Sequence, residues 1–178
     1  MQGNVDMDGH RIRNLPSPEA GDESVRLIDY VTYILPYLYH QGARVYHSAN
    51  QSIPNITLTN LTFDSETYDT DNIHDPVTNN GRLTCRTAGK YLAVLDVAFS
   101  ASNVGERTLI IMKSPFLAIG YTRLEATGNW PWVCSVSTIH QLAVDDYIYA
   151  QVYQTSGGAL NVLAVSYYSA RFMMQRIG

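Results

Sequence analysis

The chain has 178 residues and a formal net charge of −4, and 16% of its residues are charged. This length suits one domain with a short appendage, because it can bury a single hydrophobic core. The 12 Lys and Arg residues are scattered without a basic run, which excludes a nucleic-acid partner. The 13 Tyr residues, with many Thr, Ser and Asn, are typical of pleated, half-buried surfaces, so we expect a mainly β protein.

The N-terminal residues do not look like a targeting segment. Asp6, Asp8 and Arg11 lie where the apolar region of a secretory signal would have to be. The longest apolar stretch, residues 30–39, is too short to cross a bilayer and is interrupted by Pro36. We therefore expect no secretory signal and no membrane insertion, and assembly in a cytoplasm.

The two cysteines, Cys85 and Cys134, are expected to stay reduced in a cytoplasm. A buried thiol that behaves as a small apolar side chain is favoured there, although the sequence leaves their pairing open. No other Cys or His stands near either of them at the spacing of metal ligands, so neither indicates a metal site.

Two units are expected, residues 1–40 and residues 41–178, with Gln41-Gly42 at the boundary. In the first unit Asp8-Gly9 favours a tight hairpin turn, which indicates a short β-arm. We expect this unit to attach the protein to its partners and to align three copies of the chain.

A helix is expected after the arm. It begins at Asp22, whose carboxylate can accept a free backbone amide of the first turn. Ile28, Val31 and Leu35 follow at helical spacing and form an apolar stripe, and Pro36 ends the helix because it lacks the backbone N–H. An isolated helix of this length is only marginally stable in water. The stripe therefore predicts a three-stranded bundle at a trimer interface.

The second unit alternates and turns like an antiparallel sandwich. Its turns carry Asn and Gly, as in Asn79-Asn80-Gly81 and Ser156-Gly157-Gly158. About ten short strands at this spacing predict a jelly roll. The expected strands cover residues 44–47, 56–63, 82–85, 91–99, 108–112, 116–123, 132–138, 147–154, 159–166 and 169–175.

The expected strand at residues 91–99 is apolar on both faces. Its odd positions form one apolar face, and Leu92 and Val94 lie on the other, which only Asp96 interrupts. A strand with one wet face would not show this pattern. We therefore assign Leu92 and Val94 to a contact between subunits.

Tyrosines of the late strands add to the expected interface. Tyr149 and Tyr167 carry amphipathic rings, which pack against a partner while the hydroxyl keeps a hydrogen bond. We assign both to the trimer interface.

Several loops are expected to be displayed on the surface. Asn103, Asn129 and Gly157 lie in polar segments without alternation, which the core does not need. Trp130 stands beside Asn129, and exposed Trp residues are common in binding hot spots. We assign these four residues to receptor binding, whereas Trp132 shares a strand face with apolar residues and is expected in the core.

The segment from residue 64 to residue 75 is rich in carboxylates. Asp69, Asp71 and Asp75 are weak candidates for a calcium site, because hard cations need several oxygen ligands. The segment lacks the Gly and terminal Glu of the helix-loop-helix calcium motif, so a solvated acidic loop is favoured and no metal or cofactor is expected.

Catalytic residues are not indicated. The five His residues are dispersed, and no Gly-x-Ser-x-Gly segment is present. We expect no enzymatic activity.

Several segments of the second unit have a recognisable order and spacing. They are Phe63-Asp64, Tyr68, Gly81-Arg82-Leu83, Ala88-Gly89-Lys90-Tyr91 with the alternating residues up to Phe99, Gln141 to Ile148, and Tyr167 to Phe172. This pattern resembles the jelly-roll core of the tumour necrosis factor and complement globular-head superfamily. The resemblance covers about residues 42–178 and implies a compact homotrimer.

The segment Val5 to Pro18 resembles a different family. Its Asp-Gly turn, followed by Ile12-Arg13-Asn14-Leu15-Pro16, is similar to a short module of tailed-bacteriophage fibres that leads into a helix. Together the two resemblances imply a virion protein.

The expected function is that of a non-enzymatic, homotrimeric fibre or fibre-tip protein of a tailed bacteriophage. It would join other virion proteins through residues 1–40 and attach to a host-surface glycan or protein. A capsid decoration or cement trimer is the main alternative, because the chain is short and has no long shaft. A soluble complement-like lectin is a further alternative, disfavoured by the expected lack of a secretory signal.

Overall fold

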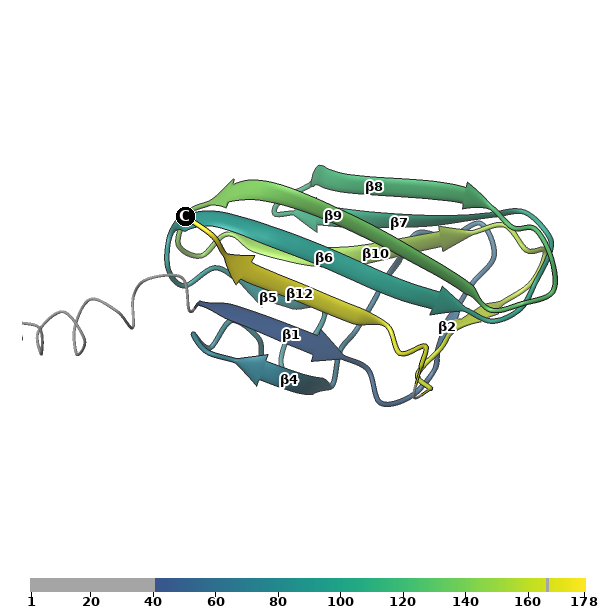
Figure 1. Cartoon of the computed structure of the whole chain (residues 1–178), viewed down its shortest axis with the longest axis horizontal. Coiled ribbons are helices and arrows are strands. Elements are labelled where there is room, and N and C mark those ends of the chain that lie inside the picture. The colour runs from purple at the N-terminus through teal and green to yellow at the C-terminus, as the bar shows by residue number, and fades with distance from the viewer. Residues whose placement is uncertain (1–40, 166) are drawn as a thin grey trace, which may run out of the picture. The chain divides into compact units, whose positions relative to one another are not determined.

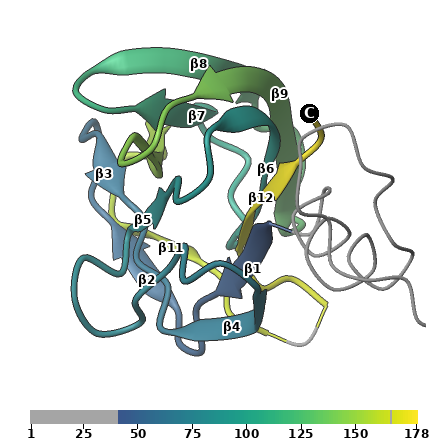
Figure 2. The same cartoon turned by 90° about the vertical axis from the view of Figure 1, so that its left-hand side faces the viewer.

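The structure, a computed structural model, describes residues 41–165 and 167–178. The expected N-terminal arm and the helix with Ile28, Val31 and Leu35 lie outside these residues. The described residues form two antiparallel sheets that pack face to face (Figures 1 and 2). The expected mainly β sandwich is confirmed, with twelve strands in place of ten. No helix in this part of the chain is long and apolar enough to cross a membrane.

Sheet A is built around its longest strands, which pair along their whole length. These are β6 (Gly89–Phe99) and β9 (Trp132–Leu142). The other strands follow on the far side of β6. They are β12 (Arg171–Arg176), β1 (Gly42–Tyr46) and β4 (Ser65–Asp69), with β11 (Leu160–Val162) and β2 (Gln51–Ile53) at one end.

Sheet B is the smaller sheet, and its centre is β10 (Tyr147–Gln154). On one side β10 pairs with β7 (Glu106–Lys113), which pairs in turn with the edge strand β8 (Leu117–Glu125). On the other side it pairs with two short strands, β3 (Thr59–Asn60) and β5 (Arg82–Thr84).

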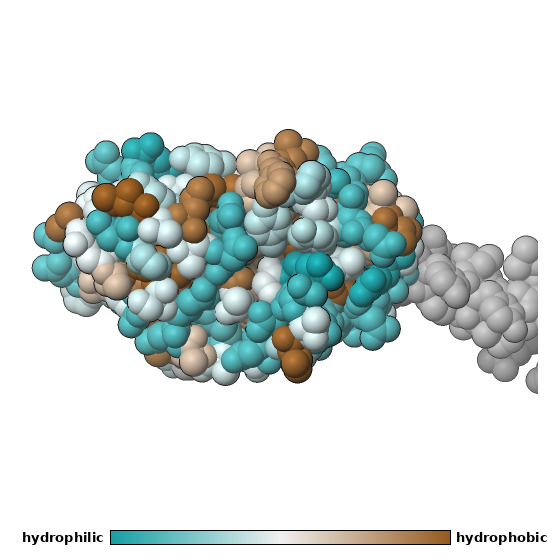
Figure 3. Space-filling model, turned by 180° about the vertical axis from the view of Figure 1, so that it is seen from behind, coloured by the Kyte–Doolittle hydropathy of each residue, from teal (hydrophilic) through white to brown (hydrophobic). Residues whose placement is uncertain are grey.

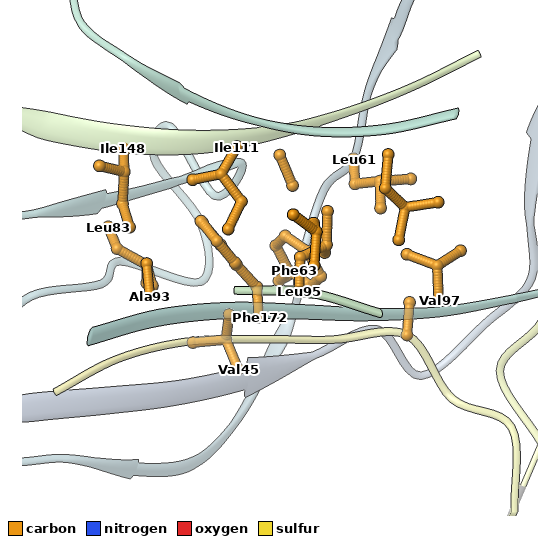
Figure 4. Close-up of a cluster of buried hydrophobic side chains, with 14 of the residues drawn as sticks. Val45, Leu61, Phe63, Leu83, Ala93, Leu95, Val97, Ile111, Ile148 and Phe172 are labelled. Atoms are coloured by element: carbon orange, nitrogen blue, oxygen red, sulfur yellow. The ribbon is translucent and has the colours of Figure 1, made fainter. Parts of the chain in front are cut away.

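The core lies between the sheets, because each strand turns alternate side chains inward. Figure 4 shows Ile111 and Ile148 of sheet B facing Leu95 and Phe172 of sheet A, and all four are fully buried. Phe63 lies between the sheets and stacks on Phe172, with ring centroids 5.8 Å apart and planes at 26°.

The predicted single strand at residues 56–63 is wrong. Within this range the structure has one short strand, β3, and the chain turns before it at Ile56, which has a φ of 55°. The apolar side chain of Ile56 suggested a strand. A positive φ is unusual for a β-branched residue, so the residue type gave no sign that the backbone turns here. Both Ile56 and Leu58 are exposed.

The acidic segment, residues 64–75, was predicted as a loop, and this is only partly correct. Its first residues form β4, the edge strand of sheet A, which pairs with β1 through a bulge between Arg44 and Val45. Glu66, Thr67 and Tyr68 are exposed on this edge. An edge strand needs no apolar face and is protected by charge, so the sequence carried no alternation to reveal it.

The sandwich has two distinct ends. β1 begins at one end, where the Lys90 backbone N–H donates to the Gly178 carbonyl at 2.6 Å, and we call this the proximal end. β6 runs from there to Phe99 at the other, distal end, a length of about 33 Å for its eleven residues. The first described residue, Gln41, and the C-terminus therefore lie at the same end (Figure 1).

Both cysteines are buried and unpaired in this structure. Burial raises the pKa of the Cys85 and Cys134 thiols, so both stay protonated at neutral pH. The Cys85 Sγ–H donates to the Thr87 carbonyl at 3.2 Å. Both thiols thus serve as packed core groups.

Replacement of Phe172 by Ala tests the core. The variant Phe172→Ala should lose about 3 to 5 kcal/mol of unfolding free energy, because it leaves a cavity beside Phe63. Urea denaturation of the purified protein measures this loss. The control Val77→Ala changes an exposed side chain and should stay within about 0.5 kcal/mol of the parent protein. A loss below about 1 kcal/mol in Phe172→Ala would contradict this core.

Candidate functional site

Three loops meet at the distal end of the sandwich, and we call them the distal loops. They are residues 100–105, 126–131 and 155–159. The Ala126 N–H donates to the Gly105 carbonyl at 2.8 Å, and the Thr155 N–H donates to the Glu106 carbonyl at 3.2 Å. The first loop therefore bridges the other two, and segments far apart in the sequence form one continuous surface.

The first distal loop is held tightly at Gly105. This residue has a φ of 72°, a conformation that favours glycine. A Cβ here would also collide with the backbone carbonyl of Thr155. The Thr155 hydroxyl accepts a hydrogen bond from the Glu106 N–H at 2.9 Å. This hydrogen bond holds the chain around Gly105 against the chain around Thr155.

The four residues assigned to receptor binding all lie in the distal loops. Trp130 is 79% exposed, and Asn103, Asn129 and Gly157 are exposed as well. Trp132 instead packs partly buried against the core, as expected. The distal end thus presents an aromatic ring beside small and amide-bearing residues, a composition suited to contact with a macromolecule or a sugar.

A buried arginine supports the distal loops from below, and the sequence analysis missed it. Arg107 is fully buried, and its Nη1 donates to the carbonyls of Val104 at 3.0 Å and Glu106 at 2.9 Å. Its Nε and Nη2 have no hydrogen-bond partner among the described residues. Burial lowers the pKa of Arg107, because no carboxylate compensates the charge. The sequence could have revealed this burial, because alternate residues of β7 point to the same side and Arg107 therefore shares a face with the core residue Leu109.

Of the residues assigned to the trimer interface, the four that the structure describes do not form one surface. Leu92 and Val94 are half-buried on the outer face of sheet A. Tyr149 lies on the outer face of sheet B, which is on the opposite side of the sandwich. Tyr167 is 88% exposed in the connection between β11 and β12. The structure therefore groups Leu92 with Val94 and separates the two tyrosines from them.

The weak calcium candidates are engaged in hydrogen bonds to the chain. The Asp69 carboxylate accepts backbone N–H groups of Asp71, Ile73 and His74 at 2.9 to 3.1 Å. Asp75 accepts two further backbone N–H groups. Asp71 accepts the hydroxyl of Thr87 at 2.9 Å. Within the described residues, no group of three or more His, Cys, Asp or Glu is placed to hold a metal ion.

Comparisons with known proteins support the fold. No protein-family model matches the chain, and no curated protein matches it. Solved structures do match. The globular domain of the zebrafish complement 1qA protein is 16% identical, with a TM-score of 0.56, and the match covers 78% of this chain and 98% of that chain.

Two further solved structures match. The Eiger tumour necrosis factor of S. frugiperda is 11% identical, with a TM-score of 0.58, covering 78% of this chain and 92% of that chain. Murine APRIL is 8% identical, with a TM-score of 0.61, covering 78% of this chain and 99% of that chain. The chain therefore has the jelly-roll fold of these proteins, and at these identities the likeness extends to the fold alone.

Removal of the buried charge tests how the distal loops are supported. Arg107→Met should raise the unfolding free energy by on the order of 1 to 4 kcal/mol, because an apolar side chain of similar size replaces an uncompensated guanidinium. It should also speed hydrogen exchange at residues 103–106, which lose their anchor. Urea denaturation and amide exchange measure the two effects.

The matched control is Arg123→Met, which removes an exposed guanidinium paired with Glu106. Its effect on stability should stay within about 1 kcal/mol. A marked loss of stability in Arg107→Met would show that a further group compensates the buried charge.

Proposed function

We propose that this chain is a homotrimeric, non-enzymatic attachment protein whose distal loops contact a receptor. The observation that carries the proposal is the polarity of the sandwich. Gln41 enters at the proximal end, and the distal loops with exposed Trp130 lie at the opposite end. A domain tethered through its N-terminal side thus presents its loops away from the tether.

The outer face of sheet A, which no other described strand covers, supports the trimer. On this face Leu92 of β6 lies beside Ile139 of β9, and Val94 lies beside Met173 of β12. Ile139 is 61% exposed. Apolar groups in adjoining positions on one sheet gain free energy when a second surface covers them.

The edge strand β8 supplies a surface that can cover this face. Leu117, Tyr121 and Leu124 are all exposed on it, and no strand among the described residues pairs with its outer edge. A contact between the edge of one copy and the face of the next is heterologous, and three such contacts close into a ring. The resembled superfamily assembles in threes, which favours the same number here.

The virion assignment rests on the N-terminal resemblance. The turn at Asp8-Gly9 and the segment Ile12 to Pro16 are similar to the phage-fibre module, and they favour a tail or head fibre. A capsid decoration trimer, which would stabilise a lattice by binding only the assembled form, is the second candidate. The two candidates differ in whether the distal loops contact a host.

The trimer is tested by a charge on the outer face of sheet A. Light scattering of the parent protein should give about three times the chain mass of 19.9 kDa. Val94→Asp should lower this to the monomer mass at micromolar concentration, because burial of an unpaired carboxylate at the interface is unfavourable.

Circular dichroism shows whether the variant keeps its β structure. The control Val77→Asp places the same charge on an exposed loop and should remain trimeric. A folded monomer of the parent protein at micromolar concentration would overturn the trimer.

Attachment is tested at Trp130. Trp130→Ala should weaken adsorption of virions to host cells about 30-fold, because truncation of a central aromatic anchor costs at least about 2 kcal/mol. The melting temperature should change by less than about 2 °C, since no cavity forms.

The matched variant is Trp132→Ala, which removes a ring that packs against the core and should lower the melting temperature sharply. Unchanged adsorption of intact particles that carry Trp130→Ala would favour the decoration candidate.

A further inference from the structure

The outer face of sheet B carries a groove that is separate from the distal loops. Its volume is about 600 Å³, and β3, β5, β7 and β10 contribute to it. The floor is a row across three strands, because Arg82 of β5 and Met112 of β7 both lie opposite Tyr149 of β10. Figure 3 views this side of the sandwich, where hydrophobic patches alternate with hydrophilic surface.

Aromatic rings form much of the groove surface. The rings of Tyr147 and Tyr149 lie 6.0 Å apart at 43°, and Phe116 borders the groove with 85% of its surface exposed. Such rings can pack against the C–H face of a sugar while polar groups at the rim bind its hydroxyls. The volume lies within the range of small-molecule sites and is large enough for a short oligosaccharide.

The groove contains one charge, and it is positive. Arg82 is the only charged residue among the described residues that line it. Its guanidinium carbon lies 4.9 Å from the centroid of the Tyr147 ring, a cation–π contact that holds the side chain in place. Within the described part of the chain its guanidinium has no hydrogen bond or ion pair, so its donors can bind a ligand.

The charge of the groove is opposite in sign to the net charge of the protein. The formal net charge is −4, yet no carboxylate lines the groove among the described residues. The nearby Asp146 is neutralised by Lys113, whose Nζ lies 2.9 Å from its Oδ1. A planar guanidinium binds a carboxylate through two parallel hydrogen bonds, which gives a preference for carboxylates.

Polar groups suited to hydroxyls surround the charge. The Gln151 amide donates to the Asn60 side-chain carbonyl at 2.9 Å, and this bond fixes both side chains at the rim. Burial and the neighbouring Tyr147 raise the pKa of Tyr149, so its hydroxyl stays protonated and can donate. The groove therefore offers donors and acceptors around an aromatic floor.

We propose that this groove binds an acidic saccharide, with the carboxylate of the sugar on Arg82 and a sugar ring on Tyr149 and Phe116. The groove lies on the outer face of sheet B, whereas the proposed trimer contact uses the outer face of sheet A and the edge of β8. It differs from the Trp130 surface, so either site can fail a test without the other.

The test uses the purified full chain and two matched pairs of probes in titration calorimetry. The first pair is digalacturonic acid and α-1,4-linked digalactose, which differ only in the carboxylates. The second pair is sialyllactose and the methyl ester of its carboxylate, which is neutral. At least one acidic probe should bind at least tenfold more tightly than its neutral partner, and added NaCl should weaken this binding.

Variants locate the binding in the groove. Arg82→Gln should remove the preference for the acidic probe, and Tyr149→Ala should weaken binding at least tenfold. The matched control is Arg86→Gln, which changes the charge equally at an arginine that does not line the groove and that lies 3.7 Å from Asp145. Arg86→Gln should bind as the parent protein does.

Four outcomes would overturn the proposal. These are no binding of either acidic probe at 10 mM, equal binding of the neutral partners, full binding by Arg82→Gln, and tighter binding of a tetraglutamate peptide or of sodium sulfate than of either acidic probe. Light scattering of the same samples reports the trimer independently, so failure of the saccharide site and failure of the proposed assembly are distinguishable.

Discussion

The two-sided apolar character of β6 is the constraint on which the rest of the molecule depends. Its inward face, with Leu95 at the centre, packs on sheet B and holds the sandwich together. Its outward face carries Leu92 and Val94, which the described residues of a single copy leave half-buried. The same strand therefore provides the core of one copy and a reason for copies to associate. Because β6 pairs with β9, β12 and β11, a disturbance of it would reach most of sheet A.

Alternation along the chain predicted the long strands well. β6, β7, β9 and β10 all have one face in the core, so a period of two residues was visible in each. It could not reveal β4, whose exposed polar side chains lie on an edge, and it suggested a strand at Ile56, where the backbone turns. Alternation of apolar and polar residues reveals a strand only where alternate side chains are buried, and this is not the case in these two segments.

The surface sites differ in how far the sequence could reveal them. The distal loops were recognisable from their Gly and Asn residues, although only the register of β7 with β8 and β10 brings them together. The groove could not be predicted, because Asn60, Arg82 and Tyr149 come from three distant segments. No single segment among them has a distinctive motif. Such a site exists only after the strands have paired.

Arg107 illustrates the cost of a shaped surface. A guanidinium without a carboxylate partner is an unfavourable element in a core. Its hydrogen bonds to Val104 of the first distal loop and to Glu106 at the start of β7 give it a role that an apolar residue could not fill. We therefore expect the jelly roll to give up some stability at the end where its loops are displayed, as is common when a protein shapes a functional surface.

The entry of the chain at Gln41 has a mechanical consequence. β1 runs from the proximal end toward the distal end and lies between β12 and β4, with five residue pairs on one side and four on the other. A load between the distal loops and the tether would pull β1 along its own axis. The hydrogen bonds on both sides would then carry the force together in shear, instead of breaking one at a time. Resistance to forced unfolding is governed by the unfolding barrier, and this geometry raises that barrier where the strand enters the domain.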